Sequence, residues 1–424
     1  MKDSKKDFGW KSVALGITAI FVIALATTYI SPNQIHRTIS LIERVGMQLA
    51  SVIISHNFRS ADEIKLRYTS PTADLSKNKV RILIVPGHEP TFGGAEYGNL
   101  KERDMALDLG QSLKSFLDQD PRYHVFITRD NSGWTPDFAT YFTQNWDRIV
   151  EWTKASKEDF ARLVPIGPVA QKEASVFHND APKSIAYRLY GITKWANENL
   201  TDITIHIHFN DHPRRNIKKP GQYSGFSIYV PADQYGNSLS TKAVANTIFK
   251  RLSAYTPVSD FLGESGGIID EPELIAVGSH NTADSASLLI EYSYIYEPQF
   301  QNKEIRSLTL QDLAFQTYLG VHDFFDPNDL YTTTGRYDTA LLPYMWKIFP
   351  KNTEPTLTDV FALQTALIFD GVYPPPGKTK NDCPRSGGFG TCTKTALEIF
   401  QNKYGITGEA GTVGEKTIEV LKKL

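Results

Sequence analysis

This chain of 424 residues has no large excess of positive or negative charge. It has 45 basic and 47 acidic residues, so its formal net charge is only −2. Proteins that bind nucleic acid usually carry a basic face or a high isoelectric point. The charge balance therefore gives no electrostatic support for a nucleic-acid partner. The length leaves room for two domains and additional segments.

Charged side chains are absent from one long segment near the N-terminus. Residues 12–36 contain no Asp, Glu, Lys or Arg, and residues 13–30 are almost wholly apolar. As a helix, residues 12–30 would be about 28 Å long, close to the ~30 Å hydrocarbon core of a bilayer. Four lysines precede this segment, and such charges favour the cytoplasmic side. We therefore expect a cytoplasmic N-terminus (1–11), a single transmembrane anchor (12–30) and an extracytoplasmic remainder in the cell envelope.

A cleaved signal peptide is the alternative for the same segment. Ala24-Leu25-Ala26 offers a small-x-small cleavage site. The apolar run is longer than a typical signal core and continues past that site, which favours the uncleaved anchor. Mature protein that starts near residue 27 in the soluble exported fraction would indicate the signal peptide instead. Both interpretations export the rest of the chain.

Cysteine is scarce, and the last part of the chain has no histidine. The only two cysteines are Cys383 and Cys392, and residues 357–424 contain no His. A zinc site in this part is therefore poorly supported. In an exported segment, such a pair predicts a disulfide that closes a short loop.

The most informative motif begins at residue 80. The β-branched run 80–85 predicts a buried strand, which Pro86-Gly87 ends, so that His88 follows in a sharp loop. Proteins of the α/β class usually place their chemistry at such strand ends. Glu102 then opens an amphipathic segment, 105–117, that has the spacing of a helix. An imidazole at a strand end and a carboxylate at a helix start can converge on one metal ion.

Further candidate ligands lie in two later strands. The alternation of residues 203–211 has a period of two, which places His206 and His208 on the same side of a strand. Two His and one Glu form a catalytic zinc set that leaves the fourth position open for water. Glu291 ends the apolar run 286–290, where a carboxylate could take a proton from that water.

The order of these pieces resembles the zinc-dependent N-acetylmuramoyl-L-alanine amidases, which trim bacterial peptidoglycan. The resemblance covers roughly residues 79–325. Its five matching segments, in order, are Pro86-Gly87-His88, Glu102, Thr128-Arg129, Ile207-His208-Phe209-Asn210 and Leu289-Ile290-Glu291. No single piece is specific, but the ordered set is.

The resemblance implies a fold, a cofactor and a set of roles. The fold would be α/β, with a mostly parallel twisted sheet flanked by helices over residues 79–325. Zn²⁺ would be bound by His88, Glu102 and His208, and Glu291 would be the catalytic base. Arg129 is expected to be structural rather than catalytic.

Three features depart from the family pattern. Glu89-Pro90 follows His88 where the family usually has glycines, and Tyr292-Ser293-Tyr294 replaces a small apolar stretch. His206 takes a place that is usually occupied by a small residue. Because a His-x-His strand can supply two ligands, a three-histidine site that frees Glu102 is a real alternative. The Asn two positions after His208 matches the family frame, which favours His208 as the ligand and His206 as a neighbouring residue.

The C-terminal part, residues 357–424, resembles a second family. Its Leu363-Gln364 and Phe400-Gln401 pairs, separated by a Gly-x-Phe-Gly turn, are similar to the three-helix peptidoglycan-binding domain. The alternative is any small helical bundle, because Leu and Phe at helical spacing are core residues by default. We expect residues 326–356 to form a linker and residues 31–78 to form a connector, with a helix over residues 41–54.

Residues 131–182 form an insertion that is much longer than an ordinary connection. It is rich in aromatic residues and predicts helix in part. Long insertions near active sites are often lids, but aromatic residues are equally typical of buried packing, which we expect for most of these.

The sequence thus predicts a membrane-anchored amidase that uses zinc-activated water to cleave the bond between N-acetylmuramic acid and L-alanine. A zinc peptidase that acts within the stem peptide is one alternative. A non-catalytic, membrane-tethered wall-binding protein is the other.

Overall fold

The computed structural model describes residues 58–69, 79–167, 169–176, 181–211, 215–326, 346–349 and 354–424. The expected anchor (12–30) and the expected helix at 41–54 lie outside these residues. Among the residues described, no helix is both long and apolar enough to cross a bilayer.

A six-stranded sheet forms the centre of residues 79–325, the part that is expected to be catalytic. Its order is β4-β1-β7-β10-β8-β9, and β4, β1, β7 and β10 run parallel to one another. Strand β8 is antiparallel to β10, and β9 is parallel to β8. The mostly parallel sheet predicted from the sequence is therefore confirmed. The strands are β1 (Val80–Pro86), β4 (Tyr123–Ile127), β7 (Ile203–Asn210), β8 (Ser227–Pro231), β9 (Ile268–Glu271) and β10 (Ala286–Tyr294).

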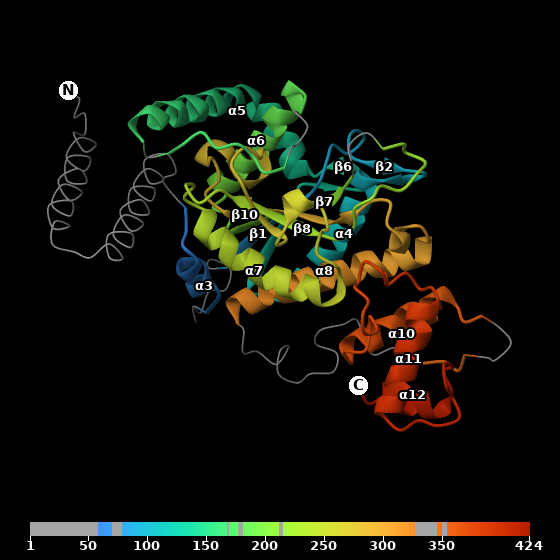
Figure 1. The fold of residues 1–424 in the computed structure, drawn as a ribbon. Coiled ribbons are helices and arrows are strands. Elements are labelled where there is room, and N and C mark those ends of the chain that lie inside the picture. Colours follow the sequence, from blue (N-terminus) through green and yellow to red (C-terminus); the bar gives the residue numbers. More distant parts are fainter. Residues whose placement is uncertain are drawn as a thin grey trace, which may run out of the picture.

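Helices cover both faces of this sheet (Figure 1). Helices α4 (Glu102–Leu117), α7 (Ser238–Tyr255) and α8 (Lys303–Phe325) lie on one face, and α5 (Pro136–Leu163) and α6 (Lys183–Glu198) lie on the other. Alternate residues of β1 serve the two layers: Ile82 and Ile84 join the core under α4, α7 and α8, while Leu83 and Val85 join the core under α5 and α6. A strand buried on both faces explains the continuous apolar run in the sequence.

Short elements complete this part of the chain. Two hairpins, β2–β3 (Glu96–Tyr97 and Leu100–Lys101) and β5–β6 (Arg129–Asp130 and Gly133–Trp134), follow β1 and β4. The 3₁₀ helices are η2 (Val164–Ile166), η3 (Leu262–Glu264), η4 (Ile275–Val277), η5 (Ser279–Asn281) and η6 (Pro298–Phe300).

Two segments outside the predicted strand–helix pattern pack firmly. Helix α3 (Ala61–Thr69), within the expected connector, buries Ile64 and Tyr68 in the main core. Helix α5 occupies much of the 131–182 insertion, and its Phe138 and Phe142 are buried against α6. The expectation that most aromatic residues of the insertion serve packing agrees with this arrangement.

The C-terminal module consists of α10 (Leu357–Phe369), α11 (Thr391–Lys403) and α12 (Glu415–Leu421), and it has a hydrophobic core of its own. Phe349, which lies in the expected linker, is buried in this core, and its amide donates to the Val413 carbonyl (2.9 Å). Cys383 and Cys392 form a disulfide, as the sequence predicted.

Candidate metal centre

His88 lies in a tight loop directly after β1. Its φ of 68° places it in the left-handed region, which non-glycine residues rarely occupy and which costs conformational energy. The preceding Gly87 donates its amide to the Ile207 carbonyl (2.8 Å), which ties the loop to β7. A Cβ at Gly87 would lie 2.6 Å from Cε1 of His208, so only glycine allows this close approach.

Glu102 is the first residue of α4, and its side chain is only 5% exposed. Its two carboxylate oxygens are held by backbone amides: Phe209 N lies 3.1 Å from Oε1, and Ala95 N lies 2.7 Å from Oε2. Burial alone would raise the pKa of Glu102. The imidazoles of His88 and His208 outweigh that effect and hold the pKa well below its usual range. The carboxylate is therefore ionised and fixed in direction.

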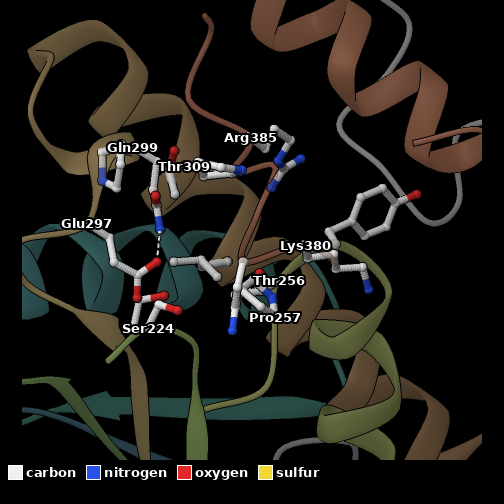
Figure 2. Close-up of a pocket in the computed structure, with 14 residues that line it drawn as sticks. Ser224, Thr256, Pro257, Glu297, Gln299, Thr309, Lys380 and Arg385 are labelled. Carbon is white, nitrogen blue, oxygen red and sulfur yellow. Dashed lines mark hydrogen bonds between the residues drawn. The ribbon is translucent and has the colours of Figure 1, made fainter. Parts of the chain in front are cut away.

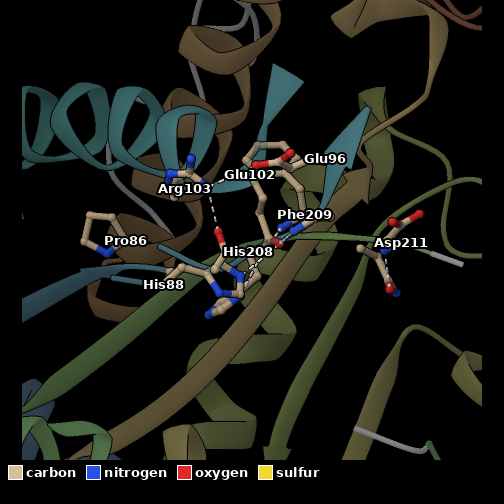
Figure 3. A network of polar contacts seen from close by, with 12 residues as sticks. Pro86, His88, Glu96, Glu102, Arg103, His208, Phe209 and Asp211 are labelled. Atoms are coloured by element: carbon tan, nitrogen blue, oxygen red, sulfur yellow. Dashed lines mark hydrogen bonds and ion pairs between the residues drawn. The ribbon is translucent and has the colours of Figure 1, made fainter. Parts of the chain in front are cut away.

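His88, Glu102 and His208 converge on one point (Figure 3). Each offers a ligand atom, and these atoms all lie within 4.8 Å of one another. His88 Nε2 is 2.8 Å from Oε2 of Glu102, and His208 Nδ1 is 3.0 Å from Oε1. The structure thus brings together the three ligands that were expected from the sequence.

The local chemistry fits a cation. The buried Nε2 of His88 approaches Glu102 without hydrogen-bond geometry and has no hydrogen-bond partner among the described residues. A Cβ at Gly94 would lie 2.9 Å from Cδ2 of His88 and 3.2 Å from Oε2 of Glu102, so the loop closes tightly around these groups. Burial lowers the pKa of His208 despite Glu102 beside it, which favours the neutral imidazole that binds metals. Two imidazoles and one carboxylate are a donor set suited to Zn²⁺.

Arg129 holds the loop that carries His88 through backbone carbonyls. Its buried guanidinium donates to three backbone carbonyls: Pro86 (3.2 Å), Gly87 (2.7 Å) and Arg103 (2.6 Å). Pro86 and Gly87 directly precede His88 in the chain, and Arg103 directly follows Glu102. The expected structural role of Arg129 agrees with these contacts, and burial lowers its pKa to about 10.

Glu291 lies beside the three converging side chains. It pairs in register with His208 across the parallel strands β10 and β7. Its Oε2 is buried and has no hydrogen-bond partner within the described part of the chain. Burial, together with the carboxylates of Glu102 and Glu264, raises the pKa of Glu291. A buried carboxylate of this kind is typical of groups that exchange protons during a reaction.

Comparison with known proteins agrees with this geometry. The sequence profile of the N-acetylmuramoyl-L-alanine amidase family matches residues 82–322, more than half of the chain. The chain belongs to this family. No curated protein sequence matches the chain.

Solved structures of such amidases are also similar to this chain. The amidase of Clostridium difficile 630 is 16% identical, with 60% of this chain and 100% of that chain covered and a TM-score of 0.37. Ami1 from Mycobacterium smegmatis is 12% identical, with 59% and 98% covered and a TM-score of 0.38. AmiC2 of Nostoc punctiforme is 16% identical, with 58% and 96% covered and a TM-score of 0.34. At these TM-scores the similarities carry no argument about fold or activity.

The sequence alone allowed His206 to be either a metal ligand or a neighbour of the ligand His208. In the structure, His206 lies outside the group of three converging side chains. Its side chain is buried in β7 between Val85 and Leu289 of the neighbouring strands. Burial, with a smaller effect from His208, lowers its pKa to about 3, so it is neutral. Within the described residues, the group that could hold an ion consists of His88, Glu102 and His208 alone.

Sequence reasoning missed a buried carboxylate behind the site. Glu264, on η3, is fully buried and accepts hydrogen bonds from Asn210 (2.7 Å) and Tyr229 (2.6 Å). It also accepts from Tyr294 (3.3 Å) and from Ser259. One departure from the amidase pattern, Tyr294, is thereby explained, because its hydroxyl helps to satisfy Glu264. No periodic signal marks Glu264 in the sequence, since it lies in an irregular segment.

Arg215 joins two loops beside the site and was also missed. Its guanidinium lies 5.2 Å from the ring centre of Tyr97 and 5.1 Å from that of Tyr296, and it pairs with Asp211. It also donates to the carbonyl of Glu96 (2.7 Å). The loop after β7 is therefore fixed to the hairpin that precedes Glu102.

Proposed function

We propose that this chain hydrolyses the amide bond between N-acetylmuramic acid and the L-alanine of the peptidoglycan stem peptide, with Zn²⁺ held by His88, Glu102 and His208. The convergence of these three ligand atoms within 4.8 Å is the observation that carries the proposal. Membership of the amidase family supports the assignment of this amide as the bond that is cleaved.

Zinc bound there would polarise the scissile carbonyl and bring the pKa of a bound water to about 7. The protein contributes fixed geometry. Glu102 is oriented by two backbone amides, and Arg129 fixes the loop that carries His88. Because the ligands are held before substrate arrives, little reorganisation is needed during the reaction.

Glu291 would move the proton. Its carboxylate accepts a proton from the attacking water and passes it to the nitrogen of the leaving L-alanine. The unpartnered Oε2 supports this role, because no other hydrogen bond competes for it among the described residues. The positive charge of zinc beside Glu102 would offset the negative charge of that carboxylate, which favours ionisation of Glu291 at neutral pH.

The two alternatives differ in their products. A zinc peptidase would release termini from within the stem peptide, and a non-catalytic wall-binding protein would release none. The amidase should release stem peptides with a free L-alanine amino group from purified muropeptides. Mass analysis of the products distinguishes the three cases.

The C-terminal module is proposed to bind peptidoglycan. Its own hydrophobic core and its disulfide support independent folding, and the short loop closed by the disulfide contributes roughly 2–3 kcal/mol in the entropy model. Because residues 357–424 resemble the peptidoglycan-binding domain, a fragment of residues 346–424, which includes Phe349 of the same core, should sediment with purified walls. Insoluble chitin, which lacks the stem peptide, is the control. A module that stays in the supernatant with walls would contradict the binding proposal.

A further inference from the structure

A buried ion pair joins the C-terminal module to the catalytic part. Arg385, which lies between the two disulfide cysteines, donates to Asp312 on α8. The two side chains are 7% and 3% exposed. A charge buried to this degree is tolerated only with a well-placed partner.

The Arg385 side chain reaches three helices at once. Its guanidinium lies 4.6 Å from the ring centre of Phe361 on α10 and 5.5 Å from that of Tyr255 on α7. It also donates to Thr365 of α10 (3.1 Å). Arg385 is thus anchored in its own module while it holds on to α7 and α8 of the catalytic part.

The rest of this junction is partly hollow. A cavity of about 110 Å³ lies between the two parts, and Figure 2 shows Glu297, Gln299 and Thr309 on one side and Lys380 and Arg385 on the other. Two further polar contacts join the neighbouring residues to the catalytic part: Lys380 donates to the Ser253 carbonyl, and Asn381 donates to Asp260 (3.1 Å). In such an interface a single buried arginine is expected to carry much of the binding energy.

The disulfide has a direct connection to this contact. It closes the loop that carries Pro384-Arg385, so the unbound loop samples fewer conformations. Ordering the loop in advance lowers the entropic cost of docking.

We propose that the disulfide-closed loop, residues 383–392, is an intramolecular clamp that docks the module on α7 and α8. Docking holds the module and the candidate metal centre in one arrangement on the wall polymer. The functional consequence rests on the proposed function, whereas the docking itself does not.

Amine labelling of Lys380 in the full chain tests the clamp. Lys380 is half-buried at the junction, while Lys403, with a side chain 46% exposed, is an internal reference in the same module. Arg385→Met leaves Asp312 unpaired, which should weaken docking by roughly 10²–10³-fold. Lys380 should then be labelled several-fold faster relative to Lys403. Asp312→Asn should have the same effect.

The double variant Arg385→Met/Asp312→Leu is the matched control. It replaces the ion pair with apolar side chains, a change that is often neutral, so Lys380 should again be labelled slowly. Replacement of both cysteines by serine should give an intermediate rate. Unchanged labelling of Lys380 in both single variants would overturn the clamp. Labelling needs no turnover, so failure of the amidase assay would count against the proposed function alone.

Discussion

Glu291→Gln should keep bound zinc and the fold but lower turnover by about 10²–10⁴-fold, the usual contribution of a general base. The amide has nearly the same shape as the carboxylate but cannot accept the proton. Oε2 of Glu291 has no hydrogen-bond partner in the described structure, so replacing this oxygen breaks no hydrogen bond there.

The rate of hydrolysis of muropeptides, measured with zinc content and thermal midpoint, tests this prediction. Glu304→Gln is the matched control, because it makes the same change from carboxylate to amide at an exposed position on α8. It should behave as the parent chain. Near-parental turnover by Glu291→Gln would show that Glu291 is structural and that another group carries the proton.

Zinc affinity should decrease strongly when any one of His88, Glu102 and His208 is replaced by alanine. The loss should exceed the ~10–100-fold that is typical of changes to the groups supporting a ligand. His206→Leu, which roughly conserves volume, should retain zinc because that side chain lies outside the converging group. Metal content after dialysis against a weak chelator measures all four variants.

Glu102→Ala also removes the acceptor for the amides of Phe209 and Ala95. The thermal stability of this variant must therefore be compared with that of the parent chain. Glu102→Gln is the milder partner, because its amide oxygen can still accept one of these bonds. Full zinc retention in Glu102→Ala combined with loss in His206→Leu would favour the three-histidine alternative.

The convergence of His88, Glu102 and His208 was predictable because each of them is tied to a regular element. His88 follows a buried strand, Glu102 begins a helix and His208 obeys the period of β7. Periodicity and turn residues report such positions from local sequence alone. The parallel register then places Glu291 next to His208, at the same edge of the sheet.

Other features depend on distant contacts that no local pattern reveals. The left-handed conformation of His88 is stabilised by the loop bonds to β7 and Arg129. Glu264 accepts hydrogen bonds from side chains of three different strands, β7, β8 and β10, in addition to the nearby Ser259. The docking of Arg385 on Asp312 joins residues 73 positions apart, and neither lies in a recognisable motif.

The identity of the new chain ends after digestion of purified muropeptides decides which bond this protein cleaves. We expect stem peptides that begin with a free L-alanine amino group, together with glycan whose lactyl groups have gained a free carboxylate. Glu291→Gln, which should release neither, controls for contaminating hydrolases. New ends within the stem peptide, with the bond between N-acetylmuramic acid and L-alanine intact, would contradict the proposed function.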